Sequence, residues 1–582
     1  MNDLHPAVLA RLERLTPDQR AAATAPPGPV LCVAPAGSGK TTTLVARVTW
    51  LVASGAPPDR IAAITFNRRA AEELRARLDP ALEEIGCPPA SVRVRTFHAL
   101  GLEILRSAGV AVRLASRASV LRRIRPDDPP ETRRRLDDAI SRLKLDAGVT
   151  ATDIAADPAP GPLARAFVAY EAALERDAAI DFDDLVVRAL RRLRSDHQLL
   201  RRWRAACEHL LVDEVQDVDR SQLELAIVLS APSHRIFLVG DDDQSIYGWR
   251  LADVRRVLHL EPRLPGLRRV DLVTNFRCPG PVVERSVRLV ERNDERFAKR
   301  ILARAVAPGR LILAPDGGPD PERWRRVLAS WPSTGATSAI LCRTNRELIG
   351  AVAAALGLGR PFGAPRVALP LDSPWLDALL DAATELDDRR RSPLMTLAAG
   401  ARSLEAQGSA RPGRRGSPID RPAPRIARPD LAPQRLDGFT EPPSADGLDD
   451  AGTIDLPDTL AAVLAWAAPY RAMPRLVDDV VATRERLQAL RRDDAPLTLS
   501  TAHGTKGLEF DHVAVLMDAE RFPSARAIED AVDPVRALEE ERRLAYVAWT
   551  RARRTLTLLY DPARPSPFLA EAFGPDELGV AA

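Results

Sequence analysis

A glycine-rich turn between an apolar segment and a segment with helical periodicity is the feature that most constrains the fold. Residues 29–34 read PVLCVA, residues 34–41 read APAGSGKT, and apolar residues recur at helical spacing from 41 to 53. Backbone N–H groups can bind phosphate in this setting, because glycine leaves room beside the backbone and a helix N-terminus is partly positive. The sequence therefore favours a nucleotide-phosphate loop over an incidental glycine turn.

Individual residues of this loop have separate expected roles. We expect Lys40 to reach the β- and γ-phosphates and the Thr41 hydroxyl to bind Mg²⁺. The loop residues expected to bind the nucleotide are Ala36, Gly37, Ser38, Gly39, Lys40, Thr41 and Thr42. ATP and Mg²⁺ are the cofactors that this loop predicts.

An acidic pair forms the second half of the expected site. The apolar residues 210–212 are followed by Asp213 and Glu214. If 210–212 is a strand, both carboxylates emerge at its carboxyl end, beside the phosphate loop. We expect Asp213 to hold Mg²⁺, directly or through water, and Glu214 to orient and deprotonate the attacking water. An acidic pair by itself more often caps a loop, and the phosphate loop earlier in the chain is what favours catalysis.

Strand-like and helix-like segments alternate through much of the chain. The strand candidates of the first half lie at 29–34, 61–66, 209–212 and 235–239, and a helix-like segment lies at 68–78. This alternation predicts an α/β fold with a parallel sheet covered by helices on both faces. The arginine-rich segment 102–181 is helical in character and indicates an inserted subdomain.

A second α/β pattern begins at residue 272. Its strand candidates lie at 339–342, 497–501, 512–517 and 555–559. Residues 408–443 interrupt it with eight prolines in 36 positions. Such a segment buries too little apolar area to offset the entropy lost on ordering, so we expect a flexible linker there.

Composition excludes some classes of protein and leaves others open. No apolar stretch is long enough to cross a membrane and the N-terminus has no secretory pattern, so a cytoplasmic protein without a membrane is expected. The five cysteines are scattered, which disfavours a zinc site. A net charge of +3 neither demands nor excludes nucleic acid. All but four of the 83 basic residues are arginine, and two of the four lysines, Lys40 and Lys506, fall in motifs.

A series of motifs identifies a family resemblance. Residues 239–250 read VGDDDQSIYGWR and resemble a motif of the UvrD/Rep/PcrA group of superfamily 1 DNA helicases. Other segments resemble motifs of that group in the same order along the chain: 15–21, 64–71, 96–98, 180–185, 274–277, 341–345, 501–510 and 540–552. The resemblance covers most of the chain.

The resemblance implies two RecA-like motor domains with parallel sheets. Motor domain 1A is expected at 1–100 and 196–271, with a helical insertion, 1B, at 101–195. Motor domain 2A is expected at 272–386 and 458–582. Family members insert a large helical subdomain, 2B, into the second motor domain. Only residues 387–457 are available for it here, so we expect a Pro-rich linker or a vestigial 2B.

The resemblance also assigns further residues to the nucleotide site. It implies that Gln19 reads the adenine edge, that Phe276 stacks on the base and that Glu509 touches the ribose. Gln244 is expected to sense the γ-phosphate and couple it to DNA. Arg277 and Arg551 resemble two arginine fingers that neutralise the transferring phosphate from the opposite domain, a task suited to the bidentate guanidinium group.

Aromatic residues near the motifs suggest a track for single-stranded DNA. Non-specific single-strand binders stack bases on aromatic side chains with basic neighbours. The strongest candidates are Phe66, Tyr247 and Trp249. The alternative interpretation is that these aromatic side chains are packed in the hydrophobic core. Weaker candidates for contacts to the strand are His98, Arg250, Arg343, Asn345 and His503.

These motifs favour an ATP-dependent single-stranded DNA translocase and 3′→5′ DNA helicase in repair, replication or recombination. Its partners would be single-stranded DNA or a tailed duplex, with the Pro-rich segment open to a protein partner. The alternative is a single-stranded-DNA-stimulated ATPase that remodels protein–DNA complexes without processive unwinding. An RNA substrate is also open, because these motifs do not report a 2′-hydroxyl preference.

Overall fold

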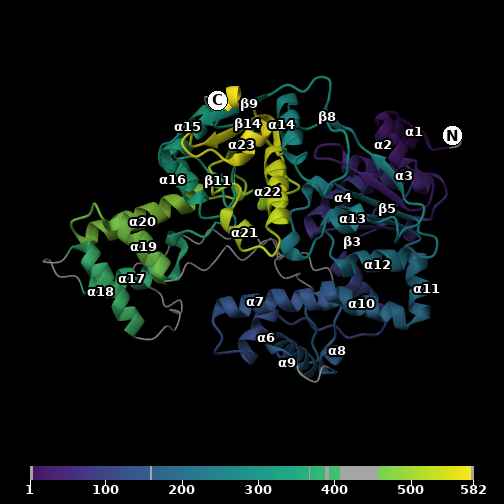
Figure 1. The fold of residues 1–582 in the computed structure, drawn as a ribbon, viewed down its shortest axis with the longest axis horizontal. Coiled ribbons are helices and arrows are strands. Elements are labelled where there is room, and N and C mark those ends of the chain that lie inside the picture. Colours follow the sequence, from purple (N-terminus) through teal and green to yellow (C-terminus); the bar gives the residue numbers. More distant parts are fainter. Residues whose placement is uncertain (1–3, 157–159, 366, 387–391, 407–455, 579–582) are drawn as a thin grey trace. The chain divides into compact units, whose positions relative to one another are not determined.

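The fold is known from a computed structural model that describes residues 4–156, 160–365, 367–386, 392–406 and 456–578. The chain forms two compact units (Figure 1). Unit 1 comprises Met1–Pro308 and Ala531–Thr550, and unit 2 comprises Gly309–Asp530 and Arg551–Ala582. Every helix within the described ranges is too short or too polar to span a bilayer.

Unit 1 is built on a six-stranded sheet in the order β3-β2-β4-β5-β1-β6, and every neighbouring pair is parallel. The strands are β1 (Val30–Val33), β2 (Ile61–Thr65), β3 (Arg93–Thr96), β4 (His209–Val212), β5 (Ile236–Gly240) and β6 (Arg268–Asp271). The strands expected at 29–34, 61–66, 209–212 and 235–239 are therefore confirmed as β1, β2, β4 and β5.

Helices cover both faces of this sheet. Leu31 and Val33 of β1 pack into one apolar cluster, and Val30 and Cys32 pack into another on the opposite face. The first cluster includes α5 (Phe97–Ser107), α10 (Asp184–Ser195) and α12 (Arg220–Ser230), and the second includes α3 (Lys40–Ala53) and α4 (Arg68–Glu83). Burial on both faces explains why the strands are continuous apolar runs.

The remaining helices of unit 1 fall into three groups. Near the N-terminus lie α1 (Pro6–Glu13) and α2 (Pro17–Ala23), and around the sheet lie α11 (His197–Ala206) and α13 (Arg255–Leu258). The helical insertion contains α6 (Arg117–Ile124), α7 (Pro130–Ser141), a π-helix (Arg142–Ala147), α8 (Ala151–Ala155) and α9 (Pro162–Arg176). Its helices share an apolar cluster around Ile140, Phe167 and Tyr170, which confirms the helical character expected for 102–181.

Unit 1 also contains a segment that the sequence placed in the second motor domain. The short strands β7 (Thr274–Asn275) and β8 (Leu302–Ala303) pair with each other, and α14 (Gly280–Val290) packs against α22 (Pro534–Trp549). Asn293 after α14 donates a hydrogen bond to the Glu539 carbonyl in α22. These contacts join 272–308 to 531–550, and hydrogen bonds from Asn275 and Phe276 to the glycine-rich loop tie both to the rest of unit 1. The predicted boundary of the motor domains at 272 stays a prediction.

Unit 2 has a second six-stranded sheet, in the order β11-β12-β10-β13-β14-β9, again parallel throughout. The strands are β9 (Arg310–Pro315), β10 (Ser338–Cys342), β11 (Phe362–Gly363), β12 (Leu497–Thr501), β13 (Phe510–Leu516) and β14 (Ala552–Tyr560). Around it lie α15 (Asp320–Ser330), α16 (Leu348–Leu358), α21 (Ala525–Glu529), α23 (Pro567–Ala572) and α24 (Pro575–Leu578). All four strands expected after residue 272 are confirmed.

Four helices of unit 2 share a small core of their own. They are α17 (Pro374–Glu385), α18 (Pro393–Ala406), α19 (Leu456–Ala467) and α20 (Met473–Leu490), drawn in green in Figure 1. Leu379, Leu397, Val463 and Leu476 are among the residues that meet in this core. Of the predicted linker or vestigial 2B at 387–457, residues 387–391 and 407–455 lie outside the described residues. Residues 393–406 form α18, which packs against α17.

Candidate active site

The glycine-rich loop lies at the carboxyl end of β1, between β5 and the edge strand β6 of the unit 1 sheet. Gly37 and Gly39 have φ angles of 70° and 82°, in the left-handed region that favours glycine. A Cβ atom on Gly37 would lie 2.8 Å from the Asn275 side-chain oxygen. The Ala34 N–H donates to the Gly240 carbonyl at 2.8 Å, which ties the loop to the end of β5. The loop conformation therefore needs its glycines.

Lys40 and Glu214 form an ion pair beside this loop. The Lys40 Nζ lies 2.7 Å from Glu214 Oε1, and the two side chains are mostly buried. Glu214 follows β4 with a positive φ of 54°, an uncommon backbone conformation for a residue with a side chain. Although burial alone would lower it, the carboxylates of Glu214 and Asp213 raise the pKa of Lys40. The lysine is therefore a cation held among carboxylates.

The donor set here fits a divalent cation. Burial and the neighbouring Glu214 charge raise the pKa of Asp213 to about 7, which marks negative charge that the protein only partly compensates. Thr41 stands in the first turn of α3, directly after Lys40. Carboxylate and hydroxyl oxygens are ligands that suit Mg²⁺. The residues predicted to hold this ion thus fit it chemically.

The segment after β5 connects to the phosphate loop through Asp241. Asp241 Oδ2 accepts hydrogen bonds from the Ala36 N–H at 3.0 Å and from the Gln244 side-chain amide at 2.7 Å. The Asp241 N–H donates to Gln216 Oε1 at 3.0 Å, and Gln216 Nε2 donates to Glu214 Oε2 at 2.5 Å. Gln244 thus lies one side chain away from the loop, and its role at the γ-phosphate stays a prediction. Asp241 and Gln216 were not among the predicted site residues.

Gln19 also lies against the phosphate loop. Its side-chain amide donates to the Ser38 carbonyl at 2.8 Å, and its Oε1 accepts from the Thr16 N–H at 3.1 Å in a capping box at the start of α2. Gln19 is buried, and a Cβ atom on Gly39 would lie 2.6 Å from its Nε2. The structure therefore places Gln19 at the loop, and its contact with adenine stays a prediction.

Residues 275–277 approach the phosphate loop from another side within unit 1. Asn275 Nδ2 donates to the Ala36 carbonyl and the Phe276 N–H donates to the Gly37 carbonyl, both at 2.8 Å. The Phe276 ring is 40% exposed, which leaves it accessible for stacking. Arg277 Nη1 donates to the Thr550 carbonyl at 3.3 Å. Asn275 is a buried contributor that sequence reasoning missed, although it lies inside the motif 274–277.

Five of the predicted residues lie in unit 2. Arg551 is buried and donates to the Leu508 carbonyl at 3.2 Å, and Glu509 forms a partly exposed ion pair with Arg553 at 3.4 Å. Arg343 and Asn345 follow β10, where the Arg343 N–H donates to Glu347. His503 follows β12. Their roles at nucleotide or DNA stay predictions.

Three aromatic rings and one arginine form a cluster at the edge of the unit 1 sheet, which we call the aromatic cluster: Phe66, Tyr247, Trp249 and Arg250. Phe66 and Tyr247 stack with centroids 5.2 Å apart, and Trp249 meets Tyr247 edge-on at 6.0 Å. The Arg250 guanidinium lies 5.4 to 6.0 Å from all three ring centroids. Trp249 is 47% exposed, whereas Tyr247, whose ring it contacts edge-on, is buried.

His98 does not join the aromatic cluster through ring contacts. It stacks on Phe182 with centroids 4.0 Å apart. Burial and the charge of Arg250 lower the pKa of His98 to about 4, against the opposing effect of Asp183. The ring is therefore neutral at physiological pH. A base could contact it by stacking or hydrogen bonding, without attraction between charges.

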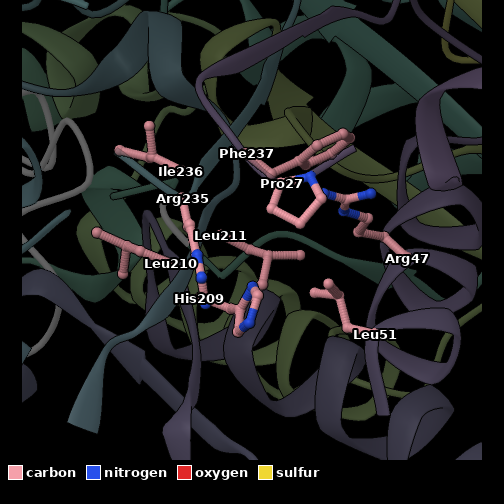
Figure 2. A pocket seen from close by; sticks show the side chains of 9 residues that line it. All are labelled: Pro27, Arg47, Leu51, His209, Leu210, Leu211, Arg235, Ile236 and Phe237. Atoms are coloured by element: carbon pink, nitrogen blue, oxygen red, sulfur yellow. The ribbon is translucent and has the colours of Figure 1, made fainter. Parts of the chain in front are cut away.

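The small cavity drawn in Figure 2 lies at the amino ends of the inner strands β4 and β5, whereas the phosphate loop lies at the carboxyl end of β1. Its nine lining residues include His209 and Ile236, which begin β4 and β5. Its volume of about 10 Å³ has room for about one water molecule. Arg47 beside it donates to the Ala23 carbonyl and lies over the Phe237 ring. This cavity is structural, because it is far too small for a nucleotide.

Comparison with known proteins agrees with this geometry. Residues 15–265 match the UvrD/REP helicase N-terminal domain, and residues 474–562 match the UvrD-like helicase C-terminal domain. The chain is 28% identical to DNA helicase II of Escherichia coli (strain K12) and 27% identical to that of Salmonella typhimurium, over 96% of the chain and 87% of either relative. It is 32% identical to ATP-dependent DNA helicase Rep of E. coli over 50% of the chain and 45% of that relative. With both domains matched in order, this chain belongs to the UvrD/Rep helicase family.

Proposed function

We propose that the protein is an ATP-dependent single-stranded DNA translocase and 3′→5′ DNA helicase. One observation carries the proposal: a single ten-residue segment joins the two candidate sites. Asp241 and Gln244 connect this segment to the phosphate loop, and Tyr247, Trp249 and Arg250 form most of the aromatic cluster. A change at the nucleotide therefore reaches the aromatic cluster through only a few residues.

The nucleotide chemistry follows from the groups at the end of the sheet. Lys40 binds the β- and γ-phosphates and offsets their charge. Thr41 and Asp213 would hold Mg²⁺, which would supply positive charge next to the phosphate oxygens. Glu214 accepts the proton of the attacking water. When ATP binds, its ion-pair partner Lys40 turns to the phosphates, and the Glu214 carboxylate can then act as a base.

Residues around the phosphate loop respond to the γ-phosphate. Gln244 senses it and relays the change along the segment to the aromatic cluster. Arg277 and Arg551 stabilise the charge on the transferring phosphate, because a planar guanidinium can contact two oxygens at once. Gln19 and Phe276 hold the base, and Glu509 holds the ribose.

The aromatic cluster binds DNA by stacking. The exposed Trp249 ring offers a face to a base, while Arg250 supplies positive charge for the phosphate backbone. Such stacking tolerates any base, which suits a motor that moves along DNA of varied sequence. Arg343, Asn345 and His503 add contacts from unit 2. With DNA as substrate, the protein acts in the cytoplasm, in repair, replication or recombination.

A second function is favoured by the small size of the α17–α20 core. Of these helices, α18 and the first residues of α19 fall within 387–457, the stretch left for the large 2B subdomain of the family. A motor with a reduced 2B would move along single strands and remodel protein–DNA complexes without processive unwinding. A protein partner would then engage the Pro-rich segment at 408–443, which lies outside the described residues.

Two assays separate these functions. ATP hydrolysis is measured with single-stranded DNA, with single-stranded RNA and with neither, and we expect DNA to give the largest stimulation. Unwinding is then measured on duplexes with a 3′ or a 5′ tail, and the helicase requires strand separation from the 3′-tailed substrate. Stimulation by DNA without strand separation supports the remodelling ATPase. An ATPase rate that is independent of nucleic acid contradicts both.

A further inference from the structure

Three consecutive aspartates are buried beside the phosphate loop. Asp241, Asp242 and Asp243 follow β5, and each is at most 2% exposed. Ionised carboxylates are costly to bury unless cations and hydrogen bonds compensate them. Near a triphosphate, uncompensated negative charge would also repel the nucleotide. The structure must therefore supply positive charge at this place.

Lys299 supplies most of this compensation. Its Nζ lies 3.1 Å from Asp241 Oδ1 and 2.8 Å from Asp243 Oδ2, and it also pairs with Asp242. Its side chain is 1% exposed. Burial alone would lower the pKa of Lys299, but the three carboxylates raise it above its usual value. A compact ammonium group with three N–H donors matches three surrounding carboxylates, which a planar guanidinium does not.

Neighbours of Lys299 complete the cluster. Arg296 makes a bidentate pair with Asp243 at 3.0 and 2.9 Å. The Phe297 N–H donates to Asp242 at 2.8 Å. Although burial opposes it, Lys299 and Arg296 lower the pKa of Asp243 to about 2. Asp243 is thus ionised, whereas burial raises the pKa of Asp242 against the opposing charge of Lys299. The ion pairs and hydrogen bonds fix the three side chains in place.

Asp241 transmits this fixed position to the nucleotide site. One of its carboxylate oxygens accepts from Lys299, and the other accepts from the Ala36 N–H and from Gln244. Lys299, together with the Asp243 N–H that donates to the same oxygen at 3.2 Å, therefore orients the carboxylate that accepts from Gln244 and the phosphate loop. Lys299 itself makes no contact with the loop among the described interactions.

We propose that Lys299 is a positioning residue for ATP hydrolysis, acting through Asp241 on Gln244 and the phosphate loop. This inference rests on the proposed function. It also accounts for a lysine that the motifs left unexplained, in a chain that uses arginine for nearly every other cation. Without Lys299, the Asp241 carboxylate can rotate, and its hydrogen bond to the Gln244 side chain is weakened.

The chain contains a matched control in Lys144. Its Nζ also contacts three carboxylates, at 2.7 Å from Glu171, 2.9 Å from Asp181 and 3.0 Å from Asp184. Its side chain is 3% exposed. Lys144 lies in the helical insertion, and its ion pairs within the described residues involve neither the phosphate loop nor residues 241–244. Replacing either lysine removes a buried ammonium from three carboxylates, but only Lys299 is linked to the nucleotide site.

The main experiment compares Lys299→Met with Lys144→Met in the full chain. Misplacing a catalytic group costs large factors in rate, so we expect Lys299→Met to lower the DNA-stimulated kcat roughly 10- to 100-fold, with KM for ATP within about threefold. Lys144→Met should keep both constants within about twofold. Lys299→Arg should recover part of the lost kcat. Equal kcat in the two methionine variants, or a rise in KM with unchanged kcat for Lys299→Met, overturns the proposal.

A double variant tests whether Lys299 acts through Gln244. If it does, Lys299→Met/Gln244→Ala should be no slower than Gln244→Ala, within about twofold. Losses that multiply would show an independent role and overturn the proposal. Should Lys299→Met fail to fold, Lys299→Met/Asp242→Asn keeps the net charge of the cluster, and the same kcat loss is expected. A wild-type protein without DNA-stimulated hydrolysis refutes the proposed function itself, whereas an active wild type with an unaffected Lys299→Met refutes only this inference.

Discussion

The two parallel sheets of this protein have the same number of strands but carry different groups at their carboxyl ends. In unit 1, β1 leads into the glycine-rich loop, β4 into Asp213 and Glu214, and β5 into the buried aspartates. In unit 2, the loops after β10 and β12 contain Arg343 and His503 instead. A sheet of this kind therefore provides positions for a site, and the loop residues decide which chemistry takes place there.

Buried charge shows the same contrast. In unit 1 the buried carboxylates that follow β5 connect to the phosphate loop, because Asp241 accepts a hydrogen bond from the Ala36 N–H. In unit 2, Arg323 of α15 makes a bidentate pair with Asp518, just after β13, at 2.8 and 2.9 Å. Asp518 also accepts from the Asp561 N–H at 2.7 Å, after β14. This pair holds a helix and two strand ends together, so we assign it to stability alone.

The largest expected effect is that of Lys40→Ala in unit 1. Removing the cation that binds the phosphates should lower kcat for ATP hydrolysis by roughly 10³-fold or more, because charge stabilisation at the reacting phosphate is lost. Steady-state ATPase assays with saturating single-stranded DNA measure this. Affinity for DNA should persist, and circular dichroism should match the wild type. Loss of folding would mean that Lys40 is structural and that the site assignment is wrong.

Arg323→Met tests the structural role assigned to the buried pair in unit 2. Breaking a buried pair leaves an uncompensated carboxylate and should cost about 3–5 kcal/mol of stability. The matched control is Arg326→Met in the same helix: Arg326 pairs with Asp316 at 2.7 Å but is 54% exposed. An exposed pair should contribute at most about 1 kcal/mol. Thermal unfolding measures both, and a change in ATP affinity for Arg323→Met would break the contrast between the units.

Trp249→Ala should have an intermediate effect, on DNA binding alone. Loss of one stacked base weakens binding by about 1–3 kcal/mol, seen as a higher Kd for a fluorescent oligothymidine. Phe276→Ala is the control, since Phe276 is a similarly exposed ring of unit 1 that lies at the phosphate loop. It should weaken ATP binding and leave DNA affinity unchanged. Equal effects of the two variants on DNA would show that the aromatic cluster is not the DNA surface.

The smallest effect concerns the two histidines expected to contact DNA, one in each unit. Burial lowers the pKa of His98 to about 4, and burial with the charges of Arg343 and Lys506 lowers the pKa of His503 to about 3. Both are neutral from pH 8 to pH 6, so a His98→Gln/His503→Gln variant should show the same pH dependence of DNA affinity as the wild type. A histidine with an unshifted pKa would instead gain a positive charge near pH 6.5 and would strengthen DNA binding as the pH falls.

The same shifts fix the sign of a stability effect. Because the folded-state pKa values lie below 6.5, the stability from neutral His98 and His503 is fully present above that pH. It is lost as the pH falls from about 6.5 toward 4 and 3. Thermal midpoints of the double glutamine variant should therefore fall less than those of the wild type in this range. A parallel fall would show that the rings already protonate near pH 6.5.

The amino-acid sequence determined the elements and the local chemistry of this protein. Apolar runs gave the strands, because strands buried on both faces must be apolar throughout. The spacing of glycines, Lys40 and Thr41 gave the phosphate loop, because that chemistry is made by neighbours along the chain. The same holds for Asp213 with Glu214 and for Tyr247 with Trp249. The amino-acid sequence therefore predicts best those features that are formed by residues close together along the chain.

Tertiary structure alone decided which distant residues meet. Asn275 and Lys299 contribute to the environment of the phosphate loop from more than 200 residues away, and no periodicity signals such a contact. Because lysine is rare in this chain, the sequence alone marks Lys299 as unusual. It does not show that Lys299 pairs with the aspartates after β5. The packing of α14 on α22, which places 272–308 in unit 1, was equally hidden, because it depends on surfaces that exist only after the helices have formed. Burial then set which charges must pair, since the cost of an unpaired charge depends on its surroundings and not on its neighbours in sequence.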